Sequence, residues 1–277
     1  MADQAVTTIN PNKALWEKGD FTRIAESMRQ SGEELVDSLD IWPGMKVLDL
    51  GCGDGTTALP AARRGARVLG IDIAENLVAA GNARATAAGL ANLELRQGDA
   101  TDLAGIADDR FDLVVSIFGA MFAPRPFDVA REMVRVTRPG GRIVMGNWIP
   151  GDPTLVAQIL KISAAFAPPP PNGFVSPMSW GDETTVRERF AAAGIAAENM
   201  RFERATWHFR HAGPPIALLE TFRHFYGPTM NAFEAAANDG REQQLADELA
   251  NLFIAQNNGG PATEIPATFL MVMVSKG

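Results

Sequence analysis

A glycine-rich turn that directly follows a short apolar run constrains this chain more than any other feature. Residues 47–50 read Val-Leu-Asp-Leu, and Gly51, Gly53 and Gly55 alternate after them. Glycine lets the backbone turn sharply and approach a bound molecule without a side chain in the way. A helical stretch opens at Thr56, and the free N–H groups of its first turn would point toward the same place. The order of strand, glycine turn and helix predicts a site for a nucleotide-like ligand.

The glycine spacing and one acidic residue narrow the choice of ligand. The dinucleotide fingerprint needs its third glycine three residues after the second, but Thr56 stands there and the glycine comes one residue early. Asp49, two residues before the turn, would repel a pyrophosphate and attract a cation. Here the chain resembles the first motif of class I S-adenosylmethionine (SAM)-dependent methyltransferases. The resemblance implies that Asp49, Gly51 and Gly53 hold the methionine end of SAM, with Cys52 as a small filler of the turn.

Two further strands end in acidic residues. The run 67–72 ends in Asp72, 21 residues after Gly51, a spacing at which a carboxylate accepts hydrogen bonds from a ribose diol. The alternative role for Asp72 is to cap the helix that follows. The alternating run 93–100 ends in Gly-Asp-Ala, and the alternative for its acid is an ordinary Asx turn. The resemblance implies that Ile73, Asp99 and Ala100 surround the adenine of SAM.

The middle of the chain continues the alternation of strands and helices. Residues 111–118 predict a strand buried on both faces, and residues 126–136 predict a helix. Residues 138–141 predict a turn before a strand over 142–148, and the letters RPGGRIVM resemble the methyltransferase signature at this point. Short connections between such units predict a doubly wound α/β sheet whose strand ends share one edge. Ser116 is at that edge too, so we add it to the expected SAM site.

The resemblance also implies the domain organisation. It is close over residues 44–149 and implies a seven-stranded Rossmann-like methyltransferase sheet with helices on both faces. We expect strands over 200–211 and 266–274, the last one antiparallel, and an inserted helical lid over 215–258. The predicted units are an N-terminal helical lid over 1–42 and a methyltransferase domain over 43–277, with substrate-cap segments at 150–182 and 212–262.

The N-terminal segment is expected to be helical over residues 13–40. Ser31 and Glu34 have the spacing of a capping box for its last part. In related methyltransferases a helix of this kind lies over the cofactor, so Trp16 fits a lid residue over SAM. The alternative for Trp16 is an ordinary core position, which aromatic usage favours.

The expected methyl acceptor is a small, largely apolar molecule. Phe118, Met121, Phe122 and Trp148 are expected to line its site, although such residues also fit an ordinary core. Methyl transfer from a sulfonium is an in-line displacement that depends on alignment of donor and acceptor, and a general base is optional. The product would be S-adenosylhomocysteine (SAH), and oxygen, nitrogen and carbon all stay open as the accepting atom.

His211, His224 and Tyr226 are the candidates for a catalytic base. His208 is expected in solvent. His208 and His211 are three residues apart on one predicted strand and would point to opposite faces, so we predict no metal site. No Asn-Pro-Pro-aromatic tetrad follows the strand 111–118, which disfavours methyltransferases that act on amino groups of adenine or glutamine.

Charge and composition argue against several other classes of protein. The net charge is −8 and the isoelectric point is near 5.0, which argues against a nucleic-acid partner or an anionic membrane surface. The sequence has no apolar run of about 18 residues, so it predicts no membrane-spanning helix. Residues 1–4 lack the basic start of a signal peptide, and the chain has a single cysteine, so the cytoplasm is expected. The sequence favours no oligomeric state. The alternative functions are a SAM-binding protein without transferase activity and an NAD-dependent oxidoreductase.

Overall fold

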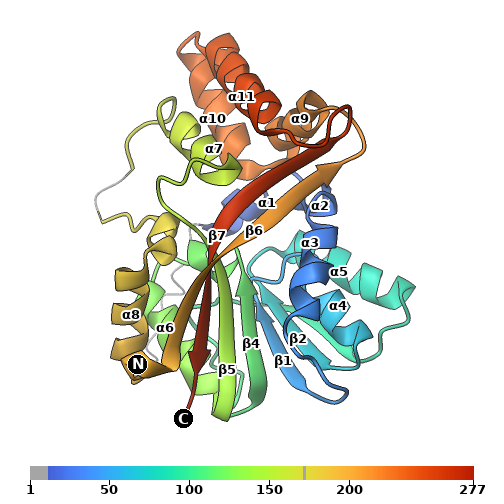
Figure 1. The fold of residues 1–277 in the computed structure, drawn as a ribbon, viewed down its shortest axis with the longest axis vertical. Helices are drawn as coiled ribbons and strands as arrows, with labels where there is room; N and C mark the ends of the chain where they lie inside the picture. The colour runs from blue at the N-terminus through green and yellow to red at the C-terminus, as the bar shows by residue number, and fades with distance from the viewer. Residues whose placement is uncertain (1–11, 171–172) are drawn as a thin grey trace, which may run out of the picture.

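A seven-stranded sheet in the order β3-β2-β1-β4-β5-β7-β6 forms the centre of the molecule (Figure 1). This computed structural model describes residues 12–170 and 173–277. Strands β1 to β5 are parallel, and β7 lies antiparallel between β5 and β6. The strands are β1 Lys46–Leu50, β2 Arg67–Asp72, β3 Leu93–Gln97, β4 Phe111–Ile117, β5 Thr137–Trp148, β6 Met200–His211 and β7 Thr263–Ser275. The predicted doubly wound α/β fold is confirmed.

Helices cover both faces of the parallel strands, as the apolar strand sequences require. Leu48 of β1 and Val114 of β4 are fully buried, because these central strands have a helical layer on each side. One layer holds α3 Arg29–Asp37, α4 Ala58–Arg63 and α5 Glu75–Ala87; the other holds α6 Pro126–Val136 and α8 Glu183–Ala192. These layers lie on opposite sides of the sheet in Figure 1.

A group of four helices stands beyond the carboxyl ends of the parallel strands, at the top of Figure 1. We call this group the cap. Its members are α7 Leu155–Ala164, α9 Pro215–Phe225, α10 Gly227–Asn238 and α11 Glu242–Gln256. Helix α7 packs against α10 and α11, and the insertion α9–α11 falls between the paired strands β6 and β7. The predicted position of the helical insertion is therefore confirmed.

The N-terminal segment differs from the single helical stretch expected over 13–40. It forms three helices, α1 Asn12–Glu17, α2 Phe21–Glu26 and α3. The predicted capping box is wrong, because α3 has Met28 as its N-cap and Ser31 lies inside the helix. The Ser31 hydroxyl instead accepts a hydrogen bond from the His208 N–H at 3.0 Å and donates one to the His208 carbonyl at 3.1 Å. Ser31 therefore joins α3 to the edge strand β6.

One predicted boundary also changes. The turn predicted at 138–141 is instead a bulge within β5, since pairing with β4 shifts from Phe111↔Thr137 to Leu113↔Arg142. The Gly140 N–H donates to the Lys276 carbonyl at 2.7 Å, which keeps this segment in the sheet. Helix α7 begins after residue 154, because the Asp152 carboxylate accepts from the Thr154 N–H at 2.9 Å and turns the chain first.

Some expectations fall on residues outside the described ranges. They are the signal-peptide prediction at 1–4 and residues 1–11 of the N-terminal lid. Within 12–170 and 173–277, no helix is long and apolar enough to cross a membrane.

Candidate active site

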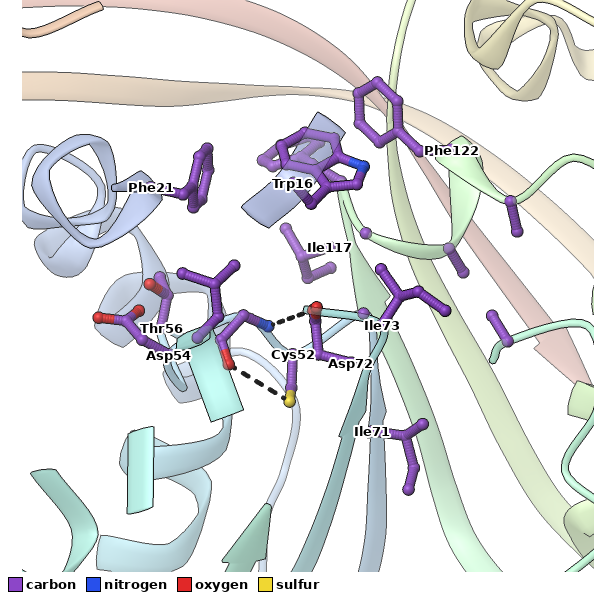
Figure 2. Close-up of a pocket in the computed structure, with 18 of the residues that line it drawn as sticks. Trp16, Phe21, Cys52, Asp54, Thr56, Ile71, Asp72, Ile73, Ile117 and Phe122 are labelled. Atoms are coloured by element: carbon purple, nitrogen blue, oxygen red, sulfur yellow. Dashed lines mark hydrogen bonds between the residues drawn. The ribbon is translucent and has the colours of Figure 1, made fainter. Parts of the chain in front are cut away.

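A pocket lies at the carboxyl ends of β1, β2 and β4, under α1 and α2 (Figure 2). We call it the loop pocket, because the glycine turn forms its floor. The pocket and its mouth hold about 940 Å³ of empty volume, which is ample for a small-molecule ligand. Most of the residues expected to bind SAM line it: Trp16, Gly51, Cys52, Gly53, Asp72, Ile73, Asp99 and Ala100.

Gly53 and Asp72 form the centre of the loop pocket. The Gly53 N–H donates to Asp72 Oδ2 at 2.7 Å (Figure 2). The Ala74 N–H donates to Asp72 Oδ1 at 2.9 Å. The Asp72 carboxylate thus ties the glycine turn to the start of α5, although Ala74 is the N-cap of that helix. Gly53 has a φ of +53°, and a Cβ added there would meet nothing within 4 Å. The backbone at Gly53 therefore faces open space in which a ligand fits.

Asp49 and Ser116 lie behind the wall of the loop pocket. The Thr57 hydroxyl donates to Asp49 Oδ2, whereas Oδ1 is buried without a partner in the described part of the chain. Burial, with the nearby Asp72 carboxylate adding to it, raises the pKa of Asp49 to about 7. The Ser116 hydroxyl donates to the Leu50 carbonyl at 2.6 Å and accepts from the Ala120 N–H at 3.0 Å. Ser116 thereby fixes the backbone that closes the pocket.

Asp99 forms the Asx turn considered for it and also lines the loop pocket. Its Oδ1 accepts from both the N–H and the hydroxyl of Thr101 at 2.8 Å, which is an Asx turn. The same residue and Ala100 line the loop pocket. The turn and a ligand-facing position are therefore compatible.

Asp54 is a pocket residue that sequence reasoning missed. It is 2% exposed and forms ion pairs with Arg29 of α3 and Arg84 of α5. One Arg29 guanidinium nitrogen donates to Asp54 Oδ1 and to the Thr56 hydroxyl, both at 2.8 Å. Because Arg29 is in α3, 25 residues before Asp54 of the glycine turn, no local motif marks this pair. The pair clamps α3 to the glycine turn.

A second, smaller pocket adjoins the loop pocket; we call it the inner chamber. It holds about 420 Å³ of empty volume including its opening, and its lining is almost entirely aromatic and aliphatic. Trp16, Phe21, Met28, Phe118 and Phe122 line both pockets. The inner chamber and the loop pocket are therefore neighbours, and these shared side chains stand between them.

The residues expected to bind the methyl acceptor are divided between the two pockets. Phe118 and Phe122 line both, and Trp148 lines the inner chamber. Met121 is 1% exposed and lines neither. Trp207, which was not predicted, lines the loop pocket, and its buried indole N–H has no partner within the described ranges.

Helix α1 brings Trp16 over the loop pocket and connects to the cap. The Trp16 ring lies edge-on to Phe122 and Phe21, with centroid distances of 4.8 and 5.6 Å (Figure 2). Gly19 pairs with Tyr226 in an isolated antiparallel bridge, and Lys18 forms an ion pair of 2.7 Å with Glu234 of α10. The N-terminal helices and the cap are therefore joined above the two pockets.

Of the three catalytic candidates, the structure brings only Tyr226 to these pockets, where it lines the inner chamber. His211 Nδ1 accepts from the Gly213 N–H at 3.0 Å and faces an outer groove. His224 is exposed and lies 3.2 Å from Glu220 of its own helix. His208 is half-buried at the strand edge. No cluster of metal-ligating side chains occurs among the residues that the structure describes.

The chain is similar to known methyltransferases in sequence and to solved structures in fold. The methyltransferase domain family profile matches residues 48–145. An uncharacterized protein of Mycobacterium tuberculosis is 34% identical over 242 residues, which cover 86% of this chain and 84% of that protein. The nocamycin O-methyltransferase of Saccharothrix syringae is 40% identical over 128 residues, 45% of each chain. The crystal structure of YcgJ from Bacillus subtilis has a TM-score of 0.59 at 17% identity, covering 89% of this chain and 98% of that one. The profile match begins in β1 and ends in β5, the part of the sheet that carries the loop pocket.

Proposed function

Because the chain belongs to the class I SAM-dependent methyltransferases, we propose that it transfers the methyl group of SAM to a small, largely apolar molecule. The observation that carries this proposal is the junction of the two pockets. A loop pocket with polar backbone and carboxylate groups adjoins an apolar inner chamber, and the two share five side chains, four of them aromatic. A charged donor and an apolar acceptor would each find a matching surface, with the reacting atoms near the shared side chains.

The loop pocket fits SAM in its charge and in its free space. Gly53 faces open space, and Asp49 Oδ1 is a buried carboxylate oxygen without a described partner, directly behind the turn. An ammonium group near the turn would favour the ionised form of Asp49. The residues that would hold SAM are Asp49, Gly51 and Gly53 at the methionyl part, Asp72 at the ribose, and Ile73, Asp99 and Ala100 at the adenine. SAM supplies a methyl group activated by the sulfonium charge.

The chain contributes alignment of the reactants and exclusion of water. Trp16 and Phe21 cover the loop pocket from α1 and α2, and Phe118 lies between the pockets. Such enclosure holds donor and acceptor in line, which can supply a large part of the rate enhancement. We therefore assign segments 1–42, 150–182 and 212–262 as the lid and substrate cap of a methyltransferase domain over 43–277.

Two other functions are less well supported. An NAD-dependent oxidoreductase would place a pyrophosphate near Asp49, which repels it. A SAM-binding protein without transferase activity has no use for an enclosed aromatic chamber beside the cofactor. The net charge of −8 supports a small molecule over a nucleic acid, and the lone cysteine supports the cytoplasm as the site of action.

The proposal is tested by calorimetric titration of the full chain with SAM, SAH and NAD. We expect SAM and SAH to bind and NAD not to bind. Asp72→Ala is expected to weaken SAH binding by about tenfold or more, because hydrogen bonds to a charged group are lost. Asp247→Ala, which removes an exposed carboxylate of α11, is the matched control and keeps the wild-type affinity.

Transfer itself is tested with a panel of ring-containing small molecules. The protein is incubated with SAM and each compound, and mass spectrometry detects a methylated product together with SAH. Binding of NAD without binding of SAM or SAH would overturn the assignment of the loop pocket. Binding of SAH without product from any compound would favour the non-catalytic alternative.

A further inference from the structure

Two side chains that line the inner chamber carry hydrogen-bond donors for which the described part of the chain supplies no acceptor. Tyr226 is 7% exposed and Trp148 is 4% exposed, and both line the chamber. No hydrogen bond joins the Tyr226 hydroxyl or the Trp148 indole N–H to another residue in the described ranges, and both atoms keep some accessible surface. Buried Tyr and Trp side chains usually find a partner for this polar atom, because leaving it unpaired is costly. The two free donors therefore point to a ligand that accepts hydrogen bonds.

The rest of the chamber defines what kind of ligand this is. Beyond the side chains shared with the loop pocket, it is lined by Ile24, Val156, Ile159, Leu160, Phe209 and Phe222. These residues offer only carbon and hydrogen, which suits an apolar body with flat faces. Among the residues that the structure describes, no Lys, Arg or His lines the chamber, so an anionic group on the ligand would be buried without a counter-charge from them. The matching ligand is neutral, apolar and ring-containing, and carries an oxygen that accepts a hydrogen bond.

Both donor side chains are held in place by other rings. The Tyr226 ring contacts Phe222 at a centroid distance of 5.4 Å and Phe21 at 6.0 Å. The Trp148 ring stacks on Phe118 at 3.7 Å. Fixed donors lose little conformational freedom when they bind, so they discriminate well between ligands.

We propose that the inner chamber binds the methyl acceptor, and that Tyr226 and Trp148 donate hydrogen bonds to a carbonyl oxygen on it. The acceptor is then a neutral, ring-containing carbonyl compound. The identification of this ligand as the methyl acceptor rests on the proposed function. The preference of the chamber for a carbonyl compound is tested independently of that function. Tyr226 is then a positioning residue: it donates a hydrogen bond and does not act as a base. Burial raises the pKa of Tyr226 above its usual range, which keeps the hydroxyl protonated.

The test uses two probes that differ only in the accepting atom. 2-Acetylnaphthalene carries a carbonyl oxygen, and 2-isopropenylnaphthalene has a CH₂ group in its place. Binding of each probe to the full chain is measured by equilibrium dialysis, with and without saturating SAH. We expect the wild type to bind the ketone about tenfold more tightly, the size of one well-formed hydrogen bond. Tyr226→Phe is expected to reduce this ratio to about threefold or less without changing the affinity for the hydrocarbon.

A second variant locates the probes in the chamber. Leu160→Trp fills the chamber from α7 and is expected to abolish binding of both probes while SAH still binds, which also shows that the protein is folded. An unchanged ketone preference in Tyr226→Phe would overturn the proposal, as would full probe binding by Leu160→Trp. Absence of binding of both probes to a wild type that binds SAH would also overturn it. Failure of SAH to bind would instead count against the proposed function, because the dialysis without SAH reports on the chamber alone.

Discussion

The ring of Phe118 lies flat against Trp148, with the ring centroids 3.7 Å apart and an angle of 8° between the planes. Trp207 and Phe269 contact Phe118 edge-on at 5.1 and 5.3 Å. Phe118 follows β4 with a φ of +57°, a left-handed conformation that non-glycine residues seldom adopt. Packing on several sides therefore holds a strained residue at the junction of the two pockets.

The strain at Phe118 can be measured by comparing Phe118→Ala with Phe118→Gly. Both variants lose a buried ring, at a cost of about 3–5 kcal/mol in unfolding free energy. Glycine is expected to be the more stable of the two by about 1 kcal/mol, because it adopts a positive φ without strain. The measurement is urea denaturation. The matched control is Phe269 of β7, which is also buried but has no positive φ, so alanine should be the more stable replacement there. The same order at both positions would contradict the prediction.

The buried carboxylate of Asp49 predicts how stability depends on pH. Its pKa is about 7 in the folded protein and near 3.8 in the unfolded chain, so the folded state binds more protons between these values. The contribution of Asp49 to the unfolding free energy of the ligand-free protein therefore falls as pH rises toward 7, and it stays level above pH 7. Asp49→Asn does not ionise but still accepts from the Thr57 hydroxyl. Its stability relative to wild type should increase from pH 5 to pH 8 by on the order of 2 kcal/mol, measured by denaturation at each pH.

The same residue predicts how ligand affinity depends on pH. If an ionised Asp49 attracts the ammonium group of SAH, wild-type affinity rises as pH increases through 7. Asp49→Asn should bind SAH more weakly at pH 8, with a nearly flat profile over this range. Calorimetry at several pH values measures both profiles. Parallel profiles for wild type and variant would show that Asp49 does not act on the ligand.

The parallel half of the fold could be predicted from the sequence because its signals are local. Apolar runs, the glycine turn and the helix signals at 126–136 all act within a few residues, and the structure has β1, β2 and α6 at the predicted bounds. The bulge at 138–141 could not be predicted, because Gly140 bonds to Lys276 at the other end of the chain. Ser31 has the spacing of a cap, but contact with β6 places it inside a helix.

The candidate site also divides into residues that local sequence signals could place and residues that depend on contacts between distant parts of the chain. Residues that follow strands reach one edge by topology alone, so the turn and Asp72 could be placed in advance. The ion pair between Arg29 and Asp54 depends on how α3 packs, and the inner chamber depends on how the cap folds over the sheet. Neither follows from residue spacing. For the same reason His211 was a candidate by strand parity, although the end of β6 carries it to an outer groove.

The Arg29–Asp54 pair predicts a large effect from one substitution. Asp54 is 2% exposed, so Arg29→Met leaves a buried carboxylate with Arg84 as its remaining ion-pair partner among the described residues. Loss of one partner of a buried pair costs about 3 kcal/mol, and the loosened turn should also weaken SAH binding. The control is Arg63→Met, which breaks an exposed pair with Glu33 and should cost less than about 1 kcal/mol. Equal losses of unfolding free energy in the two variants would contradict this account of the pair.

The bridge between Gly19 and Tyr226 predicts that the N-terminal helices and the cap act together. A Cβ at Gly19 would lie 2.7 Å from both the Met230 sulfur and the Phe225 carbonyl oxygen. Gly19→Ala should therefore separate α1 and α2 from the cap and uncover the loop pocket. We expect faster hydrogen exchange in α1 and α2 and a several-fold weaker affinity for SAH, measured by mass spectrometry and calorimetry.

The variant Gly44→Ala is the control that separates the steric clash in Gly19→Ala from the backbone strain. Its φ of +85° resembles the +74° of Gly19, but a Cβ at Gly44 would meet nothing within 4 Å. Gly44→Ala is expected to cost about 1–2 kcal/mol of stability from the left-handed conformation alone, with SAH affinity and exchange in α1 unchanged. If Gly19→Ala behaved like Gly44→Ala in both measurements, the bridge would be a packing detail. The lid would then be held over the ligand by its other contacts, such as those of the Trp16 ring with Phe122 and Phe21.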